Sequence, residues 1–137
     1  MLDKEDVKVD FELTKEQLEL KKSAAEFAST ELISDPEYGD PASDFRQEDW
    51  DKCAEFGVQG WLASEQYGGS GFDALTYVLG MEGLGYGCNN NGLLFGLNAN
   101  ILSVELDVLR YGTEEQREQY GRRQVRGECI GDTGMTE

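Results

Sequence analysis

Apolar residues recur every three or four positions along most of the chain, which is the spacing of one face of an α-helix. The first such stretch opens with Thr14 and has Gln17 three residues later, the spacing of a capping box. Its apolar face comprises Leu20, Ala24, Phe27, Ala28 and Leu32. The pattern predicts a helix from about residue 14 to residue 33.

The same criteria predict a second helix over 45–56 and a third that begins after Asp73. Gly57 suits the left-handed conformation that ends a helix, and Asp73 suits the cap that starts one. The expected inner face of the third helix is formed by Leu75, Val78, Leu79 and Leu84.

A fourth helix is expected over 91–111, where the chain is apolar nearly all round. Thr113 and Gln116 repeat the capping-box spacing and predict the start of a fifth helix. Beyond residue 127 the helical period stops and the sequence becomes strand-like. The pattern predicts an all-α fold, with about five helices packed as an up-and-down bundle.

Three regions follow from these expectations. Residues 1–10 form a lead-in, residues 11–127 form the helical domain, and residues 128–137 begin a β domain that is not present.

Three glycines stand together in the stretch "EQYGGSGFDAL", residues 65 to 75. Gly69 to Ala74 satisfy the letters G-x-G-x-x-A of a dinucleotide-binding turn. Such a turn follows a buried strand and has an acidic residue about twenty positions later, and both are missing here. We therefore expect the glycines to turn the chain sharply into the Asp73 cap.

The chain of 137 residues carries 12 Lys and Arg against 28 Asp and Glu, a net charge of -16. Such a surface repels nucleic acid and anionic membranes. No apolar run is expected to span a membrane, and the N-terminus lacks the pattern of a targeting peptide. The expected location is the cytoplasm, or the mitochondrial matrix in a eukaryote.

The three cysteines, Cys53, Cys88 and Cys129, are widely spaced, and the chain has no histidine. This combination predicts neither a disulfide framework nor a metal site. It also excludes a Ser-His or Cys-His nucleophile pair within this chain.

Five segments, in order and in register, resemble the acyl-CoA dehydrogenase family over residues 11 to 137. These segments are "FELTKEQLELKKSAAEFASTEL", "WDKCAEFGVQGW", "EQYGGSGFDALTYVLGMEGLG", "LRYGTEEQREQY" and "GECIGDTGMTE". The resemblance implies the first third of an FAD-dependent enzyme that performs α,β-dehydrogenation of an acyl thioester. It implies that the catalytic glutamate and most of the flavin site lie outside this chain, which has no catalytic residue of its own.

The resemblance also implies roles for individual residues. Thr133, Met135 and Thr136 match positions beside the flavin ring. The helix over 91–111 matches the one that lines the acyl pocket, where Leu97, Asn100, Ile101 and Val104 share a face. Ordinary helix packing explains these four residues equally well. A buried Asn100 amide requires a partner, and one hypothesis is that it shapes the pocket floor for a short or polar acyl group.

Other charged residues receive plainer interpretations. Glu65, Glu82 and Glu105 are expected to be solvated carboxylates. A basic cluster, formed by Arg122, Arg123 and Arg126, is interpreted either as a solvated helix end or as a contact for an acidic carrier protein or cofactor phosphates.

The resemblance implies an acyl-CoA or carrier-protein thioester as substrate, an electron-transfer acceptor and a homo-oligomer. The alternatives are a free-standing, non-catalytic helical binding module and a dehydrogenase of a carrier-protein-tethered acyl group. The isolated chain is expected to self-associate through the apolar helix over 91–111, to retain no FAD and to be inactive.

Overall fold

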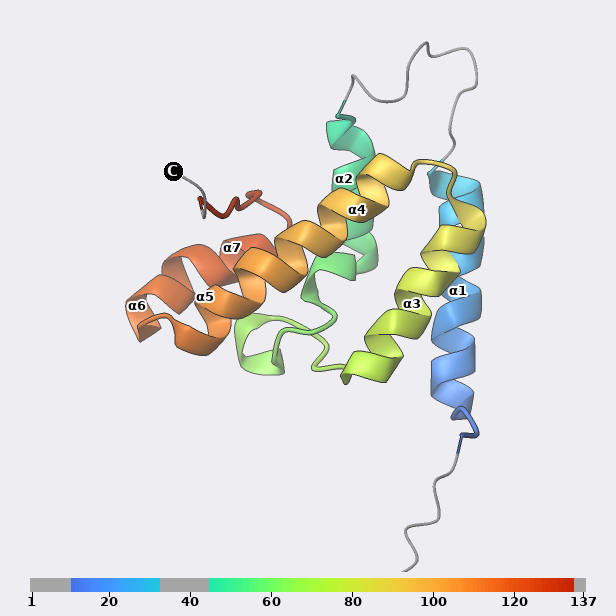
Figure 1. Cartoon of the computed structure of the whole chain (residues 1–137), viewed down its shortest axis with the longest axis horizontal. Helices are drawn as coiled ribbons and strands as arrows, with labels where there is room; N and C mark the ends of the chain where they lie inside the picture. The colour runs from blue at the N-terminus through green and yellow to red at the C-terminus, as the bar shows by residue number, and fades with distance from the viewer. Residues whose placement is uncertain (1–10, 33–44, 135–137) are drawn as a thin grey trace, which may run out of the picture.

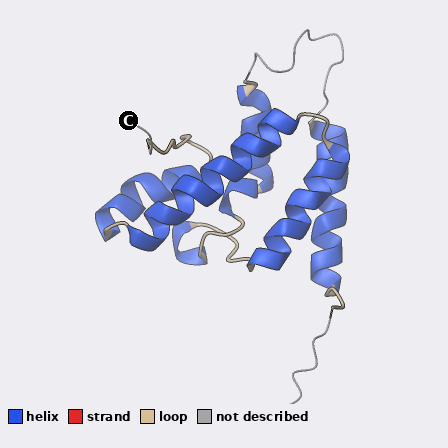
Figure 2. Ribbon diagram, viewed as in Figure 1, coloured by secondary structure: helices blue, strands red, loops and turns tan. Residues whose placement is uncertain are grey.

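The computed structural model describes residues 11–32 and 45–134, and within them every regular element is helical (Figures 1 and 2). Three α-helices and two composite helices, each interrupted by a π-helical turn, account for the fold, together with short 3₁₀ turns at Val58–Gly60 and Glu65–Tyr67. Their bounds are α1 Lys15–Glu31, α2 Gln47–Phe56, α3 Ala74–Gly87, α4 Asn91–Asn100 with the π turn Ile101–Glu105 and α5 Leu106–Tyr111, and α6 Glu114–Gln116 with the π turn Arg117–Gly121 and α7 Arg122–Val125. The all-helical prediction is confirmed.

The starts of three helices follow the predicted capping residues. Thr14 accepts a hydrogen bond from the backbone N–H of Gln17, whose side chain accepts one from Thr14 in return. Thr113 and Gln116 repeat this reciprocal pair at α6, and Asp73 caps α3. These caps satisfy backbone N–H groups that have no partner inside the helix.

Helices α1 and α3 lie side by side because α3 presents glycines to α1 (Figure 1). A Cβ atom on Gly83 would lie 2.3 Å from the Lys21 carbonyl oxygen, and one on Gly87 would lie 2.3 Å from that of Ala25. The absence of a side chain at both positions lets the two backbones approach closely.

The centre of the domain is aromatic. Trp61 is 3% exposed, and its indole makes edge contacts with the rings of Phe56 and Tyr77. Gly80 leaves room for this indole, since a Cβ there would lie 2.6 Å from its nearest carbon. Phe56 also stacks on Phe27, with ring centroids 4.2 Å apart, which joins α1 to α2.

The expected inner face of α3 is wrong in part. Leu75 and Val78 are 52% and 55% exposed, whereas Leu79 and Leu84 are buried as expected. The close contact with α1 instead uses glycines, which a search for large apolar residues does not count. The third helix is therefore rotated relative to the prediction.

The long helix, by which we mean Asn91–Tyr111 with its π turn, has the length and mean hydropathy, 1.4, of a membrane-spanning helix. The expectation that no apolar run reaches that length is wrong by this measure. Buried core helices of water-soluble proteins can pass the same test of length and composition, and 28% of the tested stretch is buried here.

The strand-like interpretation of the C-terminal segment applies to residues 128–137. The described part of it, up to Gly134, contains no strand and continues as a loop after α7 (Figure 2). Residues 135–137 lie outside the described residues.

Candidate functional site

The four residues predicted for an acyl pocket lie on the inner side of the long helix. Leu97 and Ile101 have no exposed surface, Asn100 is 2% exposed and Val104 is half-buried. Leu97 and Ile101 belong to the main hydrophobic core, together with Leu84 and Leu93. They pack within the domain, and their proposed contact with an acyl chain remains a prediction.

Glu105 is fully buried, which contradicts the expectation that it is a solvated carboxylate. It is the last residue of the π turn, which takes more residues per turn than an α-helix. The position predicted to face inward was Val104, and in the structure Glu105 is the more deeply buried of the two. The sequence contained a usable signal, since Glu105 lies four and eight residues after the buried Ile101 and Leu97.

The environment of Glu105 favours its neutral form. Neither carboxyl oxygen has a hydrogen-bond partner among the described residues, and burial raises the pKa of this carboxyl to about 8. Burial and the nearby Glu105 carboxyl raise the pKa of Tyr77, whose hydroxyl donates to Asn98 Oδ1 at 2.7 Å. Burial of Glu105 therefore favours the protonated carboxylic acid over the carboxylate at this position.

The segment after α7 is attached to the long helix beside this carboxyl. The backbone N–H of Gly131 donates to Asn100 Oδ1 at 2.7 Å, and the hydroxyl of Thr133 donates to the Ser103 carbonyl at 3.1 Å. The predicted partner of the Asn100 amide is present for its oxygen, whereas its Nδ2 has no partner among the described residues. Of the three residues predicted beside the flavin, only Thr133 is described.

The described residues fit an edge contact with a flavin ring and no larger part of a flavin site. Thr133 is exposed, its backbone N–H is bonded to Asp132 Oδ1, and its hydroxyl oxygen can still accept a hydrogen bond. The polar atoms without a partner nearby, on Asn100, Glu105 and Gln124, are buried beneath the segment and out of reach of a cofactor.

The glycine-rich stretch does not form a phosphate cradle. The backbone N–H groups of Ser70, Gly71 and Phe72 donate to the carbonyls of Gly60, Ala63 and Trp61, each at 2.8 Å. Gly68 and Gly71 have positive φ values of 92° and 65°. The prediction that these glycines turn the chain into the Asp73 cap is confirmed.

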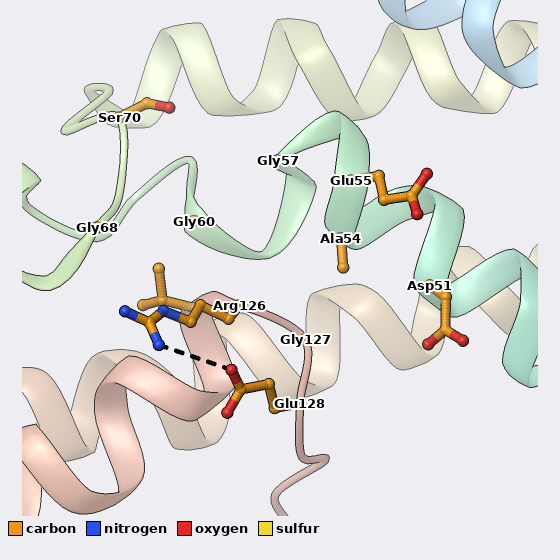
Figure 3. Close-up of a pocket in the computed structure, with 11 residues that line it drawn as sticks. Asp51, Ala54, Glu55, Gly57, Gly60, Gly68, Ser70, Arg126, Gly127 and Glu128 are labelled. Carbon is orange, nitrogen blue, oxygen red and sulfur yellow. Dashed lines mark ion pairs between the residues drawn. The ribbon is translucent and has the colours of Figure 1, made fainter.

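A groove of about 580 Å³ lies between this loop, α2 and the end of α7 (Figure 3). Its charged lining includes Asp51, Glu55 and Glu128, and the only cation among the lining residues, Arg126, is already 3.7 Å from Glu128. The groove is unsuited to phosphate because its lining is mainly negative and the loop N–H groups already donate to backbone carbonyls.

The cysteines are poor nucleophiles. Burial, with smaller contributions from Cys88 and Asp49, raises the pKa of the Cys53 thiol to about 12, and burial also raises the pKa of Cys88 and of Cys129. Thiolates are therefore scarce at neutral pH. Within the described residues no three His, Cys, Asp or Glu side chains gather as a metal site.

The three arginines of the basic cluster form ion pairs with two glutamates of the same chain. Arg122 pairs with Glu118, and both Arg123 and Arg126 pair with Glu128 at 3.8 and 3.7 Å. A partner that used these arginines would compete with those carboxylates.

Two large apolar side chains of the long helix are exposed to solvent. Phe95 is 76% exposed and Leu102, seven residues later, is 47% exposed. This spacing puts both on one face of the helix. We call Phe95 and Leu102 the outer face of the long helix. Sequence reasoning did not separate them from the buried residues because the helix is apolar nearly all round.

Comparison with known proteins gives one consistent family. The family model described as "Acyl-CoA dehydrogenase, N-terminal domain" matches residues 14–128. A probable acyl-CoA dehydrogenase of Bacillus subtilis, YngJ, is 35% identical over 129 residues, which cover 94% of this chain and 33% of that protein.

Solved structures agree with this result. The prolyl acyl carrier protein oxidase AnaB is 42% identical with a TM-score of 0.82, covering 87% of this chain and 32% of its own. Butyryl-CoA dehydrogenase from Megasphaera elsdenii is 30% identical with a TM-score of 0.79, covering 94% and 34%. The chain spans about a third of the length of each of these proteins.

Proposed function

This chain belongs to the acyl-CoA dehydrogenase family, and we propose that it is the N-terminal helical part of a flavin-dependent enzyme that dehydrogenates an acyl thioester between its α and β carbons. The observation that carries the proposal is the family match over residues 14–128, which spans all the described helices. When bound, FAD would accept the hydride from the substrate.

The acyl chain is proposed to contact the outer face of the long helix. Leu97 and Ile101 have no exposed surface, so they act as the packed support of that helix. Phe95 and Leu102 expose apolar area that water does not favour, and an acyl chain or the rest of the polypeptide would cover it. In the isolated chain, self-association through this face would cover it instead.

The flavin contact is proposed for the end of the chain. Thr133 would present its hydroxyl oxygen as a hydrogen-bond acceptor, since its proton is donated to Ser103. Met135 and Thr136 would complete the contact, as the resemblance implies. Three residues cannot hold a dinucleotide, so the isolated chain is proposed to retain no FAD.

The isolated chain is also proposed to be inactive. A general base needs access to the α carbon of the substrate, and Glu105, the carboxyl with the raised pKa, is enclosed in the domain. The base is therefore proposed to come from the remainder of the polypeptide.

A carrier-protein thioester is the second candidate substrate, because AnaB, at 42% identity, is a prolyl acyl carrier protein oxidase. The internal pairing of Arg122, Arg123 and Arg126 does not favour these residues as the docking surface for an acidic carrier. An electron acceptor is required in either case, and the cytoplasm is the proposed location.

The two substrates are distinguished by one assay on the full-length polypeptide that contains this chain, reconstituted with FAD. The same acyl groups, including prolyl and butyryl, are supplied without oxygen as CoA esters and as thioesters of a carrier protein, with free acids as controls. Bleaching of the flavin by a thioester and not by the acid is expected. No bleaching with either tethering group would contradict the proposed reaction.

A further inference from the structure

Asn100 does more than fill the core, because its side chain holds a segment distant in sequence. Its Oδ1 accepts the backbone N–H of Gly131 at 2.7 Å, across 31 positions of the chain. Three residues further along the same helix, the Ser103 carbonyl accepts the Thr133 hydroxyl. The segment after α7, the red trace in Figure 1, is thus bonded twice to the long helix.

Gly131 fits against this helix only because it lacks a side chain. A Cβ there would lie 2.4 Å from Val104 Cγ1 and 2.5 Å from Gln124 Nε2. The long helix and α7 therefore close on Gly131 from two sides. We call this arrangement the tail clamp, and its residues are Asn100, Ser103, Val104, Gln124, Gly131 and Thr133.

The clamp is built at an energetic cost. Asn100 Nδ2 and Gln124 Oε1 are buried without partners among the described residues, and a buried polar atom left unpaired is destabilising. A leucine at position 100 would avoid that cost and fill a similar volume. The amide is useful here for one visible reason, which is the bond to Gly131.

We propose that Asn100 is a positioning residue that, through Gly131, fixes how the chain leaves the helical domain and so places Thr133 for its contact with the flavin. This inference rests on the proposed function. It also replaces the idea that Asn100 shapes the floor of the acyl pocket, because a side chain that is 2% exposed reaches no substrate directly.

The test uses the full-length polypeptide with five variants, four single and one double. Asn100→Leu removes the acceptor, and Gly131→Ala forces the segment away from Val104. Val104→Ala, made alone and with Gly131→Ala, removes the nearest contact of the added methyl group and leaves the contact with Gln124 Nε2. Asn98→Leu is the matched control, since Asn98 is an amide on the same helix that bonds Tyr77 and Leu94 and not the tail.

Two readouts separate the clamp from the cofactor. Hydrogen exchange of the 129–134 amides without FAD reports the clamp, and flavin fluorescence reports the FAD dissociation constant. Loss of one hydrogen bond predicts about tenfold faster exchange of the Gly131 amide and about tenfold weaker FAD binding in Asn100→Leu and Gly131→Ala. Val104→Ala should restore part of both losses in the Gly131→Ala background, and Asn98→Leu should leave both within about twofold of wild type.

Each contrary result has a distinct meaning. Unchanged exchange at Gly131 in Asn100→Leu overturns the clamp itself. Faster exchange with unchanged FAD affinity overturns the positioning role, as does an equal loss of affinity in Asn98→Leu. If the wild-type polypeptide binds no FAD, the proposed function and the positioning role are both wrong, while the exchange data still report the clamp.

Discussion

The α1–α3 interface and the tail clamp solve the same problem, close approach of two segments, with opposite chemistry. At α1–α3, Gly83 and Gly87 let helix backbones touch, and the neighbouring core is apolar. At the tail clamp, Gly131 lies against a helix whose nearby interior is polar. Four of the seven buried side-chain atoms without partners in the described residues belong to Asn100, Glu105 and Gln124.

The two regions are therefore expected to contribute differently to the stability of the domain. Apolar close packing contributes favourable free energy, whereas unpaired buried polar groups cost it. Departures from the stable pattern concentrate at functional sites in proteins generally. Substitutions in the two regions should therefore differ in their effect on the free energy of unfolding.

The largest effect is expected in the aromatic centre beside α3. Trp61→Ala should lower the free energy of unfolding by about 3–5 kcal/mol, because it removes a buried indole and leaves a cavity. Urea denaturation measures the loss. The control is Leu75→Ala, which truncates a side chain of α3 that is 52% exposed. It should change the free energy of unfolding by less than about 0.5 kcal/mol.

The second effect belongs to Glu105 and depends on pH. Its carboxyl ionises near pH 4.5 in the unfolded chain and near pH 8 in the fold, where Tyr77 and Cys129 are its titratable neighbours. Folding therefore takes up a proton between these values, and the stability contribution present below pH 4.5 is lost as the pH rises to about 8.

Glu105→Gln removes this titration. The variant should match wild type at about pH 4 and be more stable by about 3 kcal/mol at about pH 9, below the ceiling of about 5 kcal/mol set by the pKa difference. Denaturation of both proteins across this range is the measurement, with the exposed Glu65→Gln as the control. Parallel stability profiles for Glu105→Gln and wild type would contradict the account of Glu105.

The third effect compares two glycines of α3. Gly83→Ala should destabilise the domain by about 1–3 kcal/mol, since its methyl group would meet the Lys21 carbonyl. Gly85→Ala, two residues away, has nothing within 4 Å and should stabilise the helix by about 0.5–1 kcal/mol. Thermal unfolding of both variants tests the pair, and equal shifts in Tm would refute the close helix contact.

The smallest effect concerns the start of α3. Asp73→Ala removes the cap that accepts the Thr76 backbone N–H at 2.7 Å and should cost about 1 kcal/mol. Asp73→Asn should retain most of the stability, because asparagine caps equally well. A loss of equal size in both variants would assign the effect to charge and not to capping.

Sequence reasoning predicted the elements well where local signals dominate. Thr14, Asp73 and Thr113 cap helices because capping depends on residues three positions apart. The π turn Ile101–Glu105 has no such signal, and it accompanies the burial of Glu105 in place of Val104. The predicted orientation of α3 was wrong in part because the contact of this helix with α1 uses glycines, which carry no hydrophobic signal.

The candidate site was predicted less completely than the fold. Spacing correctly indicated that Asn100 is buried and needs a partner, but the partner, Gly131, lies in a segment with no helical period. The outer face of the long helix, Phe95 and Leu102, was indistinguishable from the inner face, because both faces are apolar. Only packing against α3 and the other elements decides which side is covered.

The most direct test of the account is the intact mass and flavin content of the native polypeptide purified from its source. The account predicts a polypeptide roughly three times the 15.3 kDa of this chain, with bound FAD that an acyl thioester reduces. A native polypeptide of 15.3 kDa without flavin would contradict it and favour a non-catalytic helical binding module.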